Sequence, residues 1–202
     1  MPYQQIPFEL EQKLQRELYS GESVIWLGVP VPRLFKPETT VAFLFSIPWT
    51  AFSIFWICGA SGFSFPDLGK GFHPFMLFPL FGLPFVLIGL GMMLSPVFSY
   101  LKDCKTLYAI TNQRVITITG GRTTVVNTYE PDSIQQITKN VRGNTGDLIF
   151  THSTWKDSEG YMHNVDIGFF NIPDVDAADK ALRKLLELSK SFDDDEENSG
   201  RP

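Results

Sequence analysis

Hydrophobic and polar positions are segregated along this chain. No Asp, Glu, Lys or Arg occurs in residues 39–66 or in residues 71–101. Only Asp67 and Lys70 interrupt these two stretches, which are dense in Phe, Leu, Ile, Trp and Met. A charged side chain at the centre of a spanning helix costs about 2.5–3.5 kcal/mol, so charge-free stretches of this kind are typical of membrane-inserted segments.

Each stretch is long enough for one transmembrane helix. Such a helix needs about 20 apolar residues, which residues 41–60 and 75–97 supply. Prolines such as Pro48 and Pro84 would break a soluble helix. Within a membrane, neighbouring groups satisfy the carbonyls that proline leaves unpaired. The pattern therefore predicts a hairpin of two transmembrane helices within residues 39–101.

The residues beside the two spans predict their orientation. Arg33 and Lys36 precede the first span, and Lys102 and Lys105 follow the second. The connecting loop carries only one Asp and one Lys. Because Lys and Arg are enriched in segments that stay in the cytoplasm, we expect both termini in the cytoplasm and the loop on the opposite side.

The N-terminal segment, residues 1–38, carries a leucine stripe. Leu10, Leu14 and Leu18 recur every four residues with charged residues between them, which predicts an amphipathic helix of about three turns. Gly21 is a suitable end for this helix. The stripe either packs on the folded domain or the membrane surface, which is the simpler interpretation, or binds a partner.

Residues 102–192 form the expected cytoplasmic domain, and their pattern is mostly β. Short runs of aliphatic and β-branched residues alternate with turn residues such as the pair Gly120 and Gly121. The predicted strands are 107–111, 114–119, 123–129, an irregular strand within 134–141, 147–151 and 165–170. A helix over 171–189 closes the domain, because its apolar residues share one face. The chain thus predicts an α+β fold of a transmembrane hairpin and an antiparallel barrel or sandwich capped by a C-terminal helix.

Charge is concentrated at the end of the chain. Residues 193–197 read Asp-Asp-Asp-Glu-Glu and nearly account for the net charge of −5. A block of like charges without apolar residues repels itself, so we expect a disordered tail over 193–202. Acidic and basic side chains are equal in number across residues 101–190. Since no basic stripe is present to neutralise phosphates, nucleic acid is not an expected partner.

Candidate chemistry is sparse. The sequence has no Gly-x-Ser-x-Gly, Walker-type phosphate loop or HExxH motif. Cys58 and Cys104 fall on opposite sides of the membrane in the expected topology, and they match no zinc or redox spacing. His152, His163 and Asp166 come near one another on neighbouring predicted strands, as surface polar residues, which we expect, or as a metal site. We therefore expect no enzymatic activity, no cofactor and no metal.

Several motifs together carry a resemblance to a known family. They are Gly21-Glu22 followed by Trp26 and Pro30, Ile47-Pro48-Trp49 with Phe55-Trp56, the runs at 81–89 and 108–116, Gly146-Asp147, and Ile172-Pro173-Asp174. Over about residues 20 to 188 the chain resembles small bacterial membrane proteins that carry a bacterial pleckstrin-homology (PH) domain. The Tyr-x-Ile-Thr-Asn-x-Arg run at 108–114 is its most specific piece. The resemblance implies a PH-like fold, a bent and partly closed antiparallel sheet with a C-terminal helix at one end, in the bacterial inner membrane.

The function that we expect is a membrane-tethered, non-enzymatic PH-like binding or scaffold module, which recognises a membrane protein partner or a second copy of itself. The residues expected to form its interaction surface are Arg114, Arg122, Lys139 and Arg142. Two alternatives belong to other classes. A sensor of anionic lipid headgroups would use the same basic residues, and an oligomeric transport component would depend on the spans.

Overall fold

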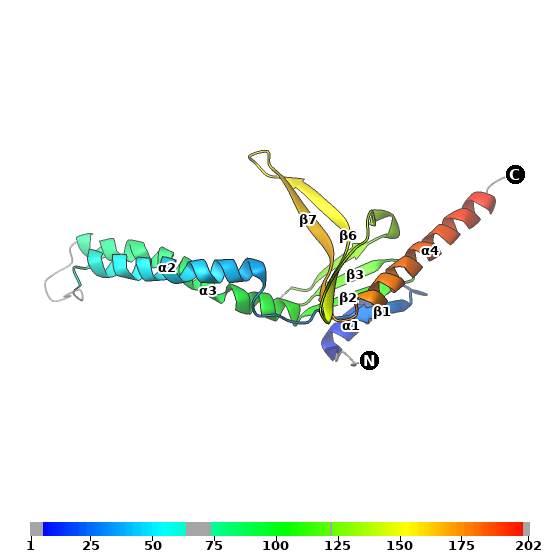
Figure 1. Ribbon diagram of the computed structural model, residues 1–202, viewed down its shortest axis with the longest axis horizontal. Helices are drawn as coiled ribbons and strands as arrows, with labels where there is room; N and C mark the ends of the chain where they lie inside the picture. Colours follow the sequence, from blue (N-terminus) through cyan, green and yellow to red (C-terminus); the bar gives the residue numbers. More distant parts are fainter. Residues whose placement is uncertain (1–5, 64–73, 122, 200–202) are drawn as a thin grey trace. The chain divides into compact units, whose positions relative to one another are not determined.

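The computed structural model describes residues 6–63, 74–121 and 123–199 (Figure 1). The chain divides into two compact units. One combines Met1–Pro32 with Lys102–Pro202, and the other is Arg33–Leu101. The N-terminal segment as far as Pro32 is therefore part of the β-rich unit, and its last residues belong to the other unit.

The first sheet of the β-rich unit has four antiparallel strands in the order β1-β2-β3-β4. The strands are β1 (Val24–Gly28), β2 (Thr106–Thr111), β3 (Val115–Thr119) and β4 (Val125–Tyr129). β2, β3 and β4 match the predicted strands to within two residues at each end. β1 was not predicted, and it joins the edge of the sheet beside β2 with an irregularity between Val24 and Trp26.

The second sheet has three antiparallel strands, β5 (Thr138–Arg142), β6 (Thr145–Lys156) and β7 (Met162–Ile172). β6 and β7 are much longer than predicted. The predicted strands were too short because the outer parts of β6 and β7 are polar and show no alternation of apolar residues. A β-bulge between β6 and β7 falls near Gly168. A Cβ atom at Gly168 would collide with the Leu148 carbonyl, so the strands approach closely there.

The two sheets do not close into a barrel, which corrects one of the two architectures that we expected. β4 and β5 are not hydrogen-bonded neighbours in either sheet. The connection between them contains the short 3₁₀ helix Pro131–Ser133, and proline has no N–H to donate to a ladder. One backbone bond, from Gln135 N–H to the Phe150 carbonyl, still ties this connection to β6.

The main core lies between the two sheets and α4 (Val175–Ser199). It includes Ile110 and Val115 from the first sheet, and Leu148, Phe150, Phe169 and Ile172 from the second, together with Ala178, Leu182 and Leu185 of α4. Aromatic rings pack inside it, with Phe150 and Phe169 5.4 Å apart in an edge-to-face arrangement. The predicted apolar face of the C-terminal helix is therefore confirmed.

A second, smaller core lies under α1 (Phe8–Glu17). Leu10 and Leu14 of the leucine stripe pack against Leu107, Ala109, Ile116 and Ile118. Alternate residues of a strand point to opposite faces, so β2 is covered by α1 on one face and by the main core on the other. Every residue of β2 is consequently buried. The interpretation that the stripe packs on the folded domain is confirmed.

The other unit contains α2 (Pro37–Ala60) and, after a 3₁₀ helix at Pro74–Gly82, α3 (Leu83–Asp103). Two helices, Pro37–Ala60 and Phe78–Asp103, are long and apolar enough to cross a membrane, and only 17% of the apolar window is buried in each. Residues 75–82 are not α-helical as expected, since Pro79 and Pro84 cannot donate backbone hydrogen bonds. Most of the connecting loop lies outside the described residues.

Small and hydroxylated residues mark the face of α2 that is buried in this unit. Ser46, Thr50 and Ser53 are buried at helical spacing. A Cβ atom at Gly89 of α3 would collide with Thr50 Oγ1, which shows that the two backbones approach closely. Trp49 Nε1 donates a hydrogen bond of 3.0 Å to the Phe85 carbonyl and ties the helices together.

The acidic tail differs from the expectation. We expected disorder over 193–202, but α4 continues through Ser199. The first turns of α4 are fixed by the core, and once a helix has nucleated each further residue adds a hydrogen bond at low cost. Residues 200–202 lie outside the described residues.

Candidate functional site

Of the four basic residues predicted to form an interaction surface, the three that the structure describes do not lie on one surface. Arg114, just before β3, is buried, with 6% of its surface exposed. Lys139 and Arg142 lie on β5 in the other sheet, and Arg122 lies outside the described residues. The expectation that Arg114 contributes to a binding surface is therefore wrong.

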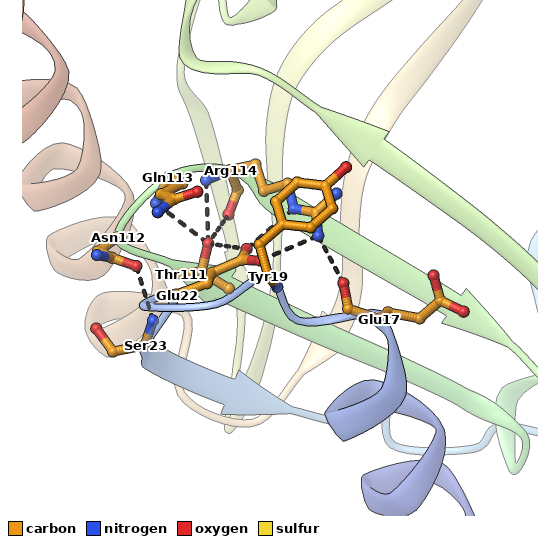
Figure 2. A network of polar contacts seen from close by, with 8 residues as sticks. All are labelled: Glu17, Tyr19, Glu22, Ser23, Thr111, Asn112, Gln113 and Arg114. Carbon is orange, nitrogen blue, oxygen red and sulfur yellow. Dashed lines mark hydrogen bonds and ion pairs between the residues drawn. The ribbon is translucent and has the colours of Figure 1, made fainter.

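Arg114 instead joins the N-terminal segment to the first sheet (Figure 2). Its Nε donates to Glu22 Oε1 at 2.9 Å, and its Nη2 donates to Glu22 Oε2 at 3.0 Å. Nη2 also donates to the Glu17 carbonyl at the end of α1, at 2.7 Å. The guanidinium lies 3.7 Å from the ring centroid of Tyr19. This bidentate geometry with an aromatic face is a typical use of arginine in a buried pair.

The turn between β2 and β3 completes the network. The Thr111 hydroxyl donates to Glu22 Oε1 at 2.7 Å, and Asn112 Oδ1 accepts a 2.8 Å bond from the Ser23 N–H. Thr111, Asn112 and Arg114 all belong to the run at 108–114. The most specific piece of the sequence resemblance thus has a structural role here, which is to dock the chain around Glu22.

The charges of this pair are stabilised by the network. Burial raises the pKa of Glu22, but hydrogen bonds from Arg114, the Tyr19 N–H and Thr111 outweigh it and hold the pKa below its usual value. The hydrogen bond with Glu22 raises the pKa of Arg114. Glu22 and Arg114 are therefore both charged over the physiological range, and the pair is a structural element.

The two predicted residues on β5 are each neutralised by a carboxylate. Lys139 Nζ lies 2.6 Å from Asp176 Oδ1, and Arg142 Nη2 lies 3.6 Å from Asp147 Oδ2. Hydrogen bonding with Asp176 raises the pKa of Lys139, and the same bond lowers the pKa of Asp176. This part of the domain therefore presents ion pairs rather than the basic face that a phosphate-binding surface would need.

An exposed feature of the domain is the outer hairpin, which we define as residues 151–167 of β6, β7 and their connecting turn. In Figure 1 the far ends of β6 and β7 extend beyond the other strands of the domain. β5 pairs only with residues 145–149 of β6, so the outer hairpin has two strands. Three of its apolar side chains are exposed: Tyr161 at 67%, Met162 at 66% and Val165 at 48%.

Polar contacts hold the outer hairpin in one conformation. Thr154 Oγ1 donates to Asn164 Oδ1 across the strands at 2.9 Å. In the turn, Asp157 Oδ1 accepts bonds from the N–H groups of Glu159 and Tyr161, both at 2.9 Å. The outer hairpin is thus ordered by its own hydrogen bonds although little of its surface is buried.

The three residues weighed as a metal site are found in two separate pairs. His152 Nδ1 lies 2.9 Å from Asp166 Oδ1, while His163 Nε2 lies 3.0 Å from Asp157 Oδ2. The hydrogen bond with His163 lowers the pKa of Asp157. Within residues 6–63, 74–121 and 123–199, no three His, Cys, Asp or Glu side chains gather at one point. The arrangement therefore consists of surface hydrogen bonds.

A cavity of about 240 Å³ lies beside the N-terminal half of α1. It is lined by residues around α1, the segment after α3 and the β3–β4 turn: Pro7, Glu9, Leu10, Lys13, Cys104, Lys105, Gly120 and Gly121. Sequence analysis did not identify this cavity, because its residues come from three segments that only the fold brings together.

Comparison of the chain with family models, with curated proteins and with solved structures gives no match. The resemblance to proteins with a bacterial PH domain therefore stays a prediction.

Proposed function

We propose that this protein is a membrane-tethered, non-enzymatic binding module, which holds a PH-like domain at the cytoplasmic face of the bacterial inner membrane and recognises a protein partner there. The observation that carries the proposal is the outer hairpin, an ordered arm with exposed apolar side chains. The PH-like assignment rests on the motifs at 108–116 and 172–174 and on the order of antiparallel strands followed by one helix.

The membrane part of the proposal is supported by the surface of α2 and α3. Large apolar side chains on both helices are exposed, among them Phe52 at 66%, Phe55 at 65% and Leu87 at 66%. Exposed apolar surface is unfavourable in water by about 25 cal/mol per Å². The core helix of a soluble domain would bury such residues, whereas lipid covers them without any other part of the chain.

The outer hairpin suits recognition of a protein. Isolated two-stranded hairpins are marginally stable in water, and this one has apolar side chains that the rest of the domain does not cover. Met162 and Val165 point to opposite faces of β7, so the outer hairpin offers an exposed apolar side chain on each face, with polar residues around it. Apolar contacts within a polar rim are the usual anatomy of a protein interface. Because the arm is already ordered, little conformational entropy would be lost on binding.

Anchoring in the membrane compensates for the small area of the proposed contact surface. A partner in the same membrane meets the domain at a high effective concentration, so a weak intrinsic affinity is sufficient. The proposed interaction surface is thus the outer hairpin, in place of a basic surface that included Arg114.

Site-specific photo-crosslinking in intact membranes tests this proposal. A photoreactive residue at Val165 or Met162 is expected to give one discrete product with a protein partner. The same residue at Lys139 or Arg142 on β5, outside the outer hairpin, is expected to give much less. A second copy with a different tag would reveal self-association. Products of equal yield from all four positions, or none from 162 and 165, would contradict the proposal.

A further inference from the structure

Two lysines meet in the cavity beside α1. Lys13 comes from α1 and Lys105 from the segment that follows α3, and both line the cavity together with Cys104, a free and exposed cysteine. The far wall is the turn at Gly120 and Gly121, which has no side chains to fill the space. A Cβ atom at Gly120 would lie 3.5 Å from Lys13 Nζ, so the ammonium group reaches across to this turn.

The charges of the cavity are open to an external anion. Unlike Lys139, neither Lys13 nor Lys105 forms an ion pair with a carboxylate of the described residues. Glu9 contributes the one carboxylate of the lining. The α1 wall is fixed in place, since Leu10 and Leu14 are buried against the first sheet. Lys13 and Lys105 therefore line one cavity, and within the described residues neither is neutralised by an ion pair.

The number of residues between α3 and Lys105 limits the distance from this cavity to the apolar part of α3. α3 ends at Asp103, and Cys104 and Lys105 follow directly. A chain extends by at most about 3.6 Å per residue, so Lys105 lies within about 14 Å of Leu101, the last apolar residue of α3. If α3 spans the membrane as proposed, this bound keeps Lys105 close to the end of the span, where basic residues meet an anionic leaflet.

We propose that this cavity binds the phosphate group of an anionic lipid headgroup, with Lys13 and Lys105 as its ligands. The inference rests on the membrane insertion included in the proposed function, and it is independent of the protein partner at the outer hairpin. Its consequence is that one lipid molecule fixes α1 and the β3–β4 turn at the membrane surface.

The test uses the Cys104 thiol as a reporter in the full chain. In a Cys58→Ser background, the purified protein in a neutral detergent is labelled with a maleimide while dioctanoyl phosphatidylglycerol, dioctanoyl phosphatidylcholine or inorganic phosphate is added. Phosphatidylglycerol is expected to slow the labelling of Cys104 saturably, and phosphatidylcholine is expected not to. Protection by inorganic phosphate but not by phosphatidylglycerol would overturn the lipid source and assign the cavity to free phosphate.

Charge variants separate the cavity from general attraction to an anionic micelle. Lys13→Gln and Lys105→Gln are each expected to raise the half-protecting phosphatidylglycerol concentration about fivefold, the equivalent of the roughly 1 kcal/mol that a lysine contributes near an anionic surface. Glu9→Gln is expected to lower it. Lys102→Gln removes the same charge from the last turn of α3 without touching the cavity, and it is expected to change nothing.

Two results would overturn the inference. One is equal effects of Lys102→Gln and Lys105→Gln, and the other is equal protection of a reporter thiol introduced by Lys102→Cys in a chain without Cys58 and Cys104. Extraction of membranes with alkaline carbonate tests the insertion itself. A chain released by carbonate would contradict the proposed function, whereas a retained chain with an unprotected Cys104 would contradict only the headgroup site.

Discussion

The inner and outer parts of the β6–β7 hairpin are continuous in the chain and opposite in character. Leu148, Phe150 and Phe169 of the inner part are completely buried. Beyond the bulge near Gly168 the same two strands continue as the outer hairpin, where Met162 and Val165 are largely exposed. The fold therefore requires the inner part, and the outer part is available for another purpose.

The polar contacts of the domain differ in the same way. The Glu22–Arg114 pair is buried, with side-chain exposures of 0% and 8% for Glu22 and Arg114, and it connects distant segments. The pairs of the outer hairpin, such as His152 with Asp166, are exposed and local. Buried pairs are costly to break because one charge is left uncompensated, whereas exposed pairs contribute little. The buried pair thus stabilises the fold by joining distant segments, whereas the exposed pairs act only within the outer hairpin.

The largest expected effect is in the core of the inner part. Phe150→Ala is expected to lower the free energy of unfolding by about 4 kcal/mol, since removing a buried aromatic ring leaves a cavity. The measurement is urea-dependent pulse proteolysis of the full chain in detergent, which follows the β-rich unit. A loss below about 1 kcal/mol would show that the inner part is not the core that we describe.

The second-largest loss of stability is expected when the buried ion pair is broken. Glu22→Gln leaves the Arg114 guanidinium buried without its counter-charge, which is expected to cost about 3 kcal/mol. Adding Arg114→Met is expected to recover part of this loss, because the double variant has no uncompensated charge. If the double variant were as unstable as the sum of both single variants, the pair would not act as a unit.

Acid is expected to weaken the same pair. The lowered pKa of Glu22 means that its stabilising effect is complete above the ordinary carboxyl pKa of about 4.3 and is lost as the pH falls through the lower pKa of the folded state. Between about pH 5 and pH 3 the urea midpoint should fall more steeply for the wild-type chain than for Glu22→Gln. Parallel slopes would exclude Glu22 as a source of the pH dependence.

The smallest effect on stability is expected in the outer hairpin. Val165→Thr replaces one β-branched residue by another at an exposed position, so the free energy of unfolding should change by no more than about 0.5 kcal/mol. Val165→Asp, in contrast, should lower the yield of the crosslink formed from a photoreactive residue at Val165's exposed neighbour Tyr161, because it places a charge beside the apolar contact. Loss of folding in Val165→Thr would mean that the outer hairpin belongs to the core.

Much of this fold could be predicted from local patterns. The leucine stripe of α1, the apolar face of α4 and the strands β2 and β3 follow from spacing alone. β1 was missed because it has only five residues, three of them half-buried, and is stabilised by pairing with β2. The outer hairpin was missed because polar strands show no alternation, and hydrogen bonds between the strands replace the burial that a sequence pattern reports.

The candidate site was predicted less well, and Arg114 illustrates the reason. An arginine beside a turn is usually a surface residue, but its carboxylate partner is Glu22, which lies 92 positions away in the sequence. The cavity of Lys13 and Lys105 likewise joins segments that are distant in the chain. Features that depend on long-range pairing of charged groups appear only once the sheets are assembled.

Hydrogen exchange of the outer hairpin, in native membranes and in the purified chain, tests the central claim most directly. We predict that amides in residues 152–165 exchange several-fold more slowly in native membranes than in detergent, because the partner covers them only in the membrane. Amides near Leu148 and Phe169 should be protected in both. Equally fast exchange of residues 152–165 in both preparations would contradict the account, since the outer hairpin would then have no partner in the membrane.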